Sequence, residues 1–204
     1  MGDEYVIKDF FRKAVEAIRK EYEEIRIPLQ TNQHFQKARK ASGKEYDFFY
    51  DEKVFVYIIF KYLCQTGFQS RIKMEENYPP PMSRSKLDIA IYGAKKEQEL
   101  IAAIEVKTPF IEKNKKFDGV NGLIKDIKKI RGYKQSSKRF LLMIVGTDND
   151  SPRDKIDTLL ETIRKKDPNI FLQDMSENFL MYNSQGNDLN AALALIRVNN
   201  NPVI

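Results

Sequence analysis

Three charged side chains stand at strand-like spacing in the middle of the chain: Asp88, Glu105 and Lys107. They lie in two apolar runs, residues 86–92 and 101–107, which are joined by a short, polar and charged segment. Runs of this kind on either side of such a segment predict a β-hairpin.

The register of that hairpin determines whether the charges meet. If Tyr92 faces Ile101, the antiparallel register also places Asp88 opposite Glu105. Alternation then puts Asp88, Glu105 and Lys107 on one face of the strand pair. Unpaired buried charge is costly and opposed like charges are destabilising, so the arrangement needs a physical reason. A divalent cation between the carboxylates would supply that reason.

A helix predicted before the hairpin carries a further candidate acid. Residues 42–45, Ser-Gly-Lys-Glu, have the capping-box spacing, and an apolar helical stripe follows them and stops at Gly67. Glu52 lies on the apolar face of this stripe, and Glu45 competes with it from one heptad earlier. Glu52 either joins the charged cluster, pairs with a lysine at the helix edge, or sits near the helix N-terminus, where the macrodipole favours an acid.

Lysines gather after the hairpin and along the next predicted helix, which opens at Asp118 or Asn121 and ends at Gly132. A one-sided basic helix beside a metal site suits a nucleic-acid backbone, although such a face is also the ordinary solvated side of an amphipathic helix. A net charge of +6 favours a polyanionic partner only mildly. The lysines expected to contact nucleic acid are Lys113, Lys115, Lys116, Lys125, Lys128 and Lys129.

The remaining hydrophobic pattern predicts the elements that position these residues. The continuous apolar run 140–145 is typical of a central strand covered on both faces. Because a helix separates it from the Glu105 strand, the two strands should run parallel, which gives a mixed sheet. The other expected elements are a helix from Asp9 to about Ile25 closed by Pro28, a strand at 68–74, a helix from Ser151 to Asp167, and strands at 170–172 and 179–182. The segment 191–198 could be a strand or a helix, and its ending Leu-Ile-Arg-Val after a hairpin-like turn favours a strand.

Length and composition set the broad class. At 204 residues the chain is expected to form an α/β nuclease-like domain at 42–204, preceded by an N-terminal helical extension and basic loop at 1–41. No apolar segment approaches bilayer length, and the chain opens with acids rather than a basic-then-apolar leader. We therefore expect a soluble cytoplasmic protein with no membrane partner.

The order of these elements resembles the PD-(D/E)xK nuclease superfamily. The elements from the Glu52 helix to the strand 140–145 follow the α-β-β-β-α-β core of its restriction-endonuclease-like fold. Leu87 stands where the family name places a proline. In the branch with a Gln-x-x-x-Tyr pair, Tyr133 is a possible match but Lys129 replaces the glutamine, so that pair is not carried over.

The resemblance implies a role for each matching position. Asp88 and Glu105 would ligate Mg²⁺ or Mn²⁺, and the Val106 carbonyl would complete the protein ligands. Lys107 would orient or deprotonate the attacking water and offset charge on the scissile phosphate. Glu52 would be the helical acid that contacts a second metal or a metal-bound water.

Three functional interpretations follow. The first is a metal-dependent nuclease that hydrolyses DNA in restriction, defence or repair, with a homodimer left open. The second keeps the fold without the chemistry, as a catalytically silent module that binds nucleic acid or a protein partner. The third takes the three charged residues as a surface salt bridge on an unrelated α/β domain.

Overall fold

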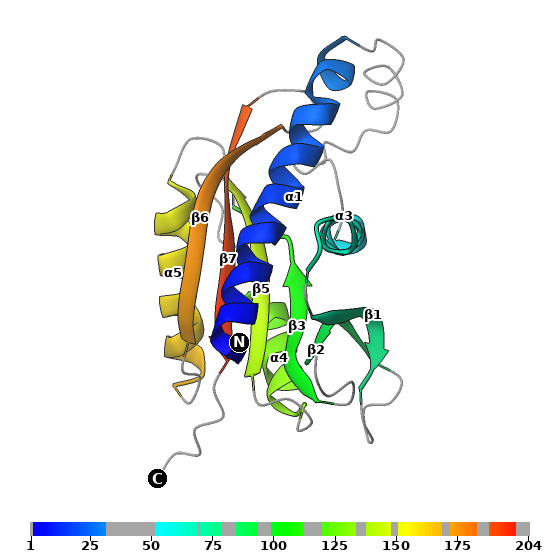
Figure 1. Cartoon of the computed structure of the whole chain (residues 1–204). Helices are drawn as coiled ribbons and strands as arrows, with labels where there is room; N and C mark the ends of the chain where they lie inside the picture. Colours follow the sequence, from blue (N-terminus) through cyan, green and yellow to red (C-terminus); the bar gives the residue numbers. More distant parts are fainter. Residues whose placement is uncertain are drawn as a thin grey trace.

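The protein belongs to the α/β class, with helices on both sides of one mixed sheet (Figure 1). The computed structural model describes residues 2–31, 52–68, 70–78, 85–93, 99–111, 120–133, 138–147, 151–168, 172–182 and 188–198. The described helices are α1 (Asp3–Thr31), α3 (Glu52–Gln65), α4 (Val120–Arg131) and α5 (Pro152–Lys166). The described strands are β1 (Arg71–Asn77), β2 (Lys86–Tyr92), β3 (Leu100–Lys107), β4 (Phe110–Ile111), β5 (Lys138–Thr147), β6 (Leu172–Tyr182) and β7 (Asp188–Val198).

The strand order of the sheet is β1-β2-β3-β5-β7-β6, and the short strand β4 pairs with β5. Strands β3 and β5 run parallel, whereas β1 with β2, β2 with β3, β5 with β7 and β6 with β7 are antiparallel. Strand β5 lies inside the sheet and is buried from Arg139 to Thr147. The predictions of a central apolar strand and of a mixed sheet are therefore confirmed.

Two of the described helices cover each face of the sheet (Figure 1). On one face, Phe10 of α1 and Ile59 of α3 pack in a cluster that includes Leu142 of β5. On the other face, Ile127 of α4 packs in a second cluster that includes Leu141. Consecutive residues of β5 thus serve opposite clusters, as the two-residue period of a strand requires.

Helix α1 is longer than the sequence indicated. It runs from Asp3 to Thr31, so the predicted start at Asp9 and the predicted end before Pro28 are wrong. Asp9 is not a cap, because it lies inside the helix, where its carboxylate accepts a hydrogen bond from Arg12 at 2.7 Å. Proline removes one backbone donor but holds φ near its helical value, so it weakens a helix without necessarily ending it. The domain boundary at 41/42 stays a prediction, since residues 32–51 lie outside the described part.

Other helix and strand boundaries also differ from those predicted. The first strand spans Arg71–Asn77 rather than 68–74, and the two short strands expected at 170–172 and 179–182 form one long strand, β6. Strand β6 pairs along its whole length with β7, which holds it extended through polar residues. The helix expected from Ser151 is confirmed, with Ser151 as its N-cap. The capping box at 42–45 lies outside the described residues.

Across the described helices, none combines the length and hydropathy that a membrane crossing requires.

Candidate functional site

The β2–β3 hairpin brings the predicted residues together. Most of its register is the predicted one, with the pairs Ile89–Ile104, Ala90–Ala103 and Ile91–Ala102. The register then shifts, and Tyr92 faces Leu100 rather than Ile101. An extra residue in one strand of an antiparallel pair produces such a shift without changing the pairs beyond it. The bulge lies at the turn end of the hairpin, and the charged residues lie at the opposite end.

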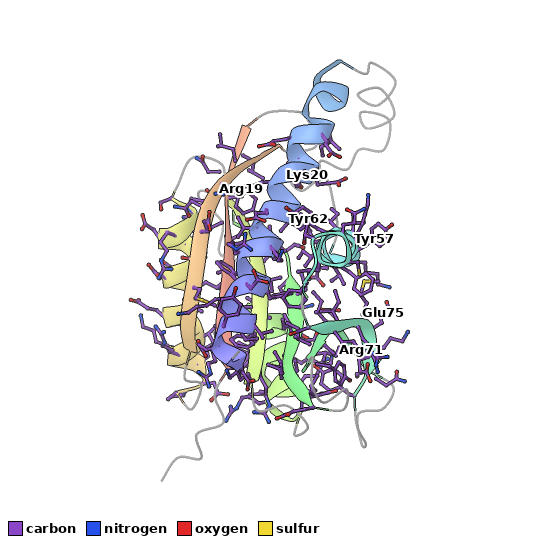
Figure 2. The ribbon with its side chains drawn as sticks, viewed as in Figure 1. Arg19, Lys20, Tyr57, Tyr62, Arg71 and Glu75 are labelled. Carbon is purple, nitrogen blue, oxygen red and sulfur yellow. The ribbon has the colours of Figure 1, made fainter. Side chains whose placement is uncertain are left out.

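Asp88 lies where strand pairing is interrupted on both sides. The β2–β3 register ends at Ile89–Ile104, and beyond it Asp88 Oδ2 accepts a hydrogen bond from the Val106 amide at 2.7 Å. In the β1–β2 register, Ile89 pairs with Met74 and Leu87 pairs with Glu76, but Asp88 between them has no pairing partner. The missing partner is Glu75 (labelled in Figure 2), whose φ of 51° lies in the left-handed region. The Asp88 carboxylate therefore replaces a backbone acceptor for the strand that carries Glu105.

Glu105 is a buried carboxylate with two donors on one oxygen. Its side chain is 4% exposed, and Oε1 accepts hydrogen bonds from the Tyr78 hydroxyl at 2.5 Å and from Lys129 Nζ at 2.9 Å. Burial, and then the negative charge of Asp88, raise the pKa of Glu105 to about 7, although the Tyr78 and Lys129 contacts oppose this rise. The negative charge of Asp88 therefore acts on the carboxylate of Glu105.

Lys107 forms the cationic part of the site. Its Nζ lies 3.0 Å from Glu52 Oε2 and 3.4 Å from Asp126 Oδ2. Burial disfavours its charge, but the hydrogen bond to Glu52 and the nearby acids outweigh burial, and the pKa of Lys107 is raised. Lys107 is thus an ammonium at neutral pH. Glu52 stands in the first turn of α3 and also meets Lys107, so it joins the cluster from a helix N-terminus.

Three residues of the cluster were not assigned to it from the sequence. Tyr78 follows β1, and Asp126 and Lys129 come from α4. Lys129 was predicted to point outward and does not: its side chain is 23% exposed, because its long stem lets the ammonium reach Glu105. The one available signal was Asp126, which is the only acid in an otherwise basic helix.

The other predicted lysines divide into two groups. Lys125 and Lys128 are exposed on α4, and Lys128 Nζ lies 3.7 Å from Asp167. Lys113, Lys115 and Lys116, like the competing acid Glu45, lie outside the described residues. The exposed face of α4 is therefore basic, as predicted, at Lys125 and Lys128.

Two carboxylates of the cluster, those of Asp88 and Glu105, could hold a hard divalent cation. Among the described residues, no group of three or more His, Cys, Asp or Glu side chains is arranged to hold a metal ion. Mg²⁺, however, keeps several waters and is commonly bound through one or two carboxylates. Within the described part of the chain, no hydrogen bond reaches Glu105 Oε2 or Asp88 Oδ1. These two carboxylate oxygens accept no hydrogen bond from the described residues and could bind a cation.

In comparisons with known proteins, the chain matches no family model, no curated protein and no solved structure.

Proposed function

We propose that this protein is a Mg²⁺- or Mn²⁺-dependent nuclease of the PD-(D/E)xK type that hydrolyses DNA phosphodiester bonds. The observation that supports it best is the hydrogen bond from the Val106 amide to Asp88, at 2.7 Å. It joins one acid to the strand on which Glu105 and Lys107 flank Val106. Two carboxylates and an ammonium from one strand pair are the groups that metal-assisted phosphodiester hydrolysis needs.

The order of elements also supports the proposal. Apart from the two-residue strand β4 between β3 and α4, the order α3, β1, β2, β3, α4 and β5 follows the α-β-β-β-α-β order of the restriction-endonuclease-like core. Strands β3 and β5 are parallel and are joined through helix α4, which is the crossover connection that this order requires. Every side chain of the cluster comes from these elements or, for Tyr78, from the residue after β1.

The residues divide the chemistry between them. Asp88, Glu105 and the Val106 carbonyl would hold the cation, which when bound lowers the pKa of water and offsets negative charge on the phosphate. Lys107 is already protonated and has a raised pKa, so it serves as a hydrogen-bond donor and positive charge for the scissile phosphate rather than as the base. Glu52 and Asp126 hold its ammonium in place.

The substrate is proposed from charge and position. Helix α4 contributes Asp126 and Lys129 to the cluster and exposes Lys125 and Lys128. A polyanionic backbone that lies along this helix would therefore reach the carboxylates. Phosphate contacts of this kind fix the position of a nucleic acid without reading its sequence.

A cleavage assay tests the proposal. Plasmid DNA, single-stranded DNA and RNA are incubated separately with the protein in Mg²⁺, Mn²⁺ or EDTA. We expect DNA cleavage with either metal, none in EDTA, and its loss in Asp88→Ala and Lys107→Ala. Asp157→Ala, at an exposed carboxylate on α5, is the matched control and should cleave normally. Cleavage that survives Asp88→Ala contradicts the assignment of the site.

A second candidate function is a catalytically silent nuclease-fold module that binds nucleic acid or a protein partner. The ion pairs Lys129–Glu105 and Lys107–Glu52 favour it, because they neutralise part of the cluster's charge without a metal. This candidate predicts DNA binding with no cleavage and no Mn²⁺ binding. The same assay, with a gel-shift measurement added, separates the two functions.

A further inference from the structure

Tyr78 and Lys129 enclose one oxygen of Glu105. The Tyr78 hydroxyl lies 2.5 Å and Lys129 Nζ 2.9 Å from Oε1. Lys129 Nζ also donates to the Lys86 carbonyl at 3.2 Å and lies 4.6 Å from the centroid of the Tyr78 ring. The Tyr78 ring also packs edge-to-face with the ring of Tyr133, and the two ring centroids are 5.0 Å apart. The two donors are thus held by each other and by their surroundings.

This arrangement fixes the orientation of a planar group. A carboxylate has only two oxygens in one plane, so two donors on Oε1 also fix the direction in which Oε2 points. Tyr78 and Glu105 are both buried, which leaves the carboxylate little room to rotate. Hydrogen bonds to ligating carboxylates orient metal ligands in this way, and their loss typically weakens metal binding 10- to 100-fold.

We propose that Tyr78 is a positioning residue: with Lys129 it holds Oε1 of Glu105, so that Oε2 is presented to a divalent cation shared with Asp88. The inference rests on the proposed function, since it requires Glu105 to be a metal ligand. Tyr78 itself touches neither the cation nor the phosphate. Its hydroxyl acts only through Glu105, and its ring supports the ammonium of Lys129.

The test is calorimetric titration with Mn²⁺ in the absence of nucleic acid. Tyr78→Phe keeps the ring and its contacts and removes only the hydroxyl, so we expect the Kd for Mn²⁺ to rise about 10- to 100-fold. The electron paramagnetic resonance spectrum of bound Mn²⁺ should broaden, because the ligand is less well oriented. Tyr62→Phe is the matched control, since the hydroxyl of Tyr62 (labelled in Figure 2) donates to Glu16 of α1 at 3.2 Å and not to a residue of the cluster.

A double variant separates positioning from a general structural role. If Tyr78 acts through Glu105, then Tyr78→Phe combined with Glu105→Gln should bind Mn²⁺ no more weakly than Glu105→Gln alone. Thermal unfolding in EDTA shows whether Tyr78→Phe is folded. Should it be unfolded, Lys129→Arg, which keeps a donor but changes its geometry, takes its place and should weaken Mn²⁺ binding in the same way.

The outcomes are distinct. If the wild type and a folded Tyr78→Phe bind Mn²⁺ with equal affinity, Tyr78 has no positioning role, and the proposed function is unaffected. Wild-type protein that binds no Mn²⁺ overturns both. Weaker binding in Tyr78→Phe, with Tyr62→Phe unchanged, supports the inference.

Discussion

The two halves of the sheet differ in regularity. In the half formed by β5, β7 and β6, the register runs without a shift from Phe140–Arg197 to Thr147–Asn190 and from Leu172–Val198 to Tyr182–Asp188. In the half formed by β1, β2 and β3, the pairing shifts at Tyr92 and skips Asp88. The charged cluster lies in the irregular half. Where the backbone pairing of two strands is interrupted, side chains can take directions that regular pairing does not allow. Such positions recur at functional sites.

The two halves also differ in what stabilises them. Strands β5 and β7 bury Leu142, Ile144, Leu193 and Leu195 against helix α1 and its neighbours. The irregular half also buries apolar residues, such as Ile89 and Ile104, but it buries Glu105 among them, and the charge of Glu105 needs Tyr78 and Lys129. Apolar burial adds stability, whereas a buried carboxylate removes some unless it is well paired. The comparison predicts that substitutions in one half change chemistry and that those in the other change stability.

The largest expected effect is on cleavage, in the irregular half. Lys107→Met removes the ammonium proposed to face the scissile phosphate, and the rate should fall by a factor of about 100 to 1000. Affinity for Mn²⁺, measured by calorimetry, should not weaken, because Lys107 is not a ligand. Lys61→Met, at an exposed lysine of α3, should cleave at the wild-type rate. An unchanged rate in Lys107→Met would remove Lys107 from the mechanism.

The regular half should respond in stability. Ile144→Ala empties a fully buried position in β5 and should lower the free energy of unfolding by about 2–5 kcal/mol. Urea denaturation followed by circular dichroism measures this change. Leu180→Ala in β6 is the control, because Leu180 is 56% exposed and its loss should cost less than about 0.5 kcal/mol. Equal costs at the two positions would mean that β5 is not the core strand.

A smaller effect on stability is expected from the ionisation of Glu105 as the pH rises. The folded protein retains the Glu105 proton up to a pKa of about 7, whereas the unfolded chain releases it near 4.5. Between these values the folded state binds more protons, so metal-free stability should fall as pH rises, by at most about 3 kcal/mol. Thermal unfolding in EDTA from pH 5 to pH 8 should show this fall in the wild type and a flatter profile in Glu105→Gln. Parallel profiles would contradict the raised pKa.

Periodic features were the ones that the sequence made predictable. In α4 and α5 the apolar residues recur with the period of a helix. The uniform apolar run of β5 indicated a strand buried on both faces. The parallel β3–β5 pair followed from the intervening helix. Most of the hairpin register followed from placing Tyr92 opposite Ile101, although a bulge shifts that one pair in the structure.

Features set by neighbours in space were not predictable. The left-handed φ of Glu75 and the bulge at Tyr92 depend on pairing that no local pattern encodes. Lys129 has the sequence neighbourhood of a solvated lysine, and only the position of Glu105 across the α4–β3 contact turns it inward. Strand β6 is polar in sequence and is held extended by β7. Long-range contacts override local propensity in each case.

Mn²⁺ binding tests the central claim, that the irregular half holds a cation between Asp88 and Glu105. Calorimetric titration is carried out on the wild type, on Glu105→Gln, and on Glu177→Gln as a control from β6 in the regular half. We predict saturable binding in the wild type and in Glu177→Gln, and much weaker but still measurable binding in Glu105→Gln. Equal binding in Glu105→Gln, or no binding in the wild type, would contradict the account.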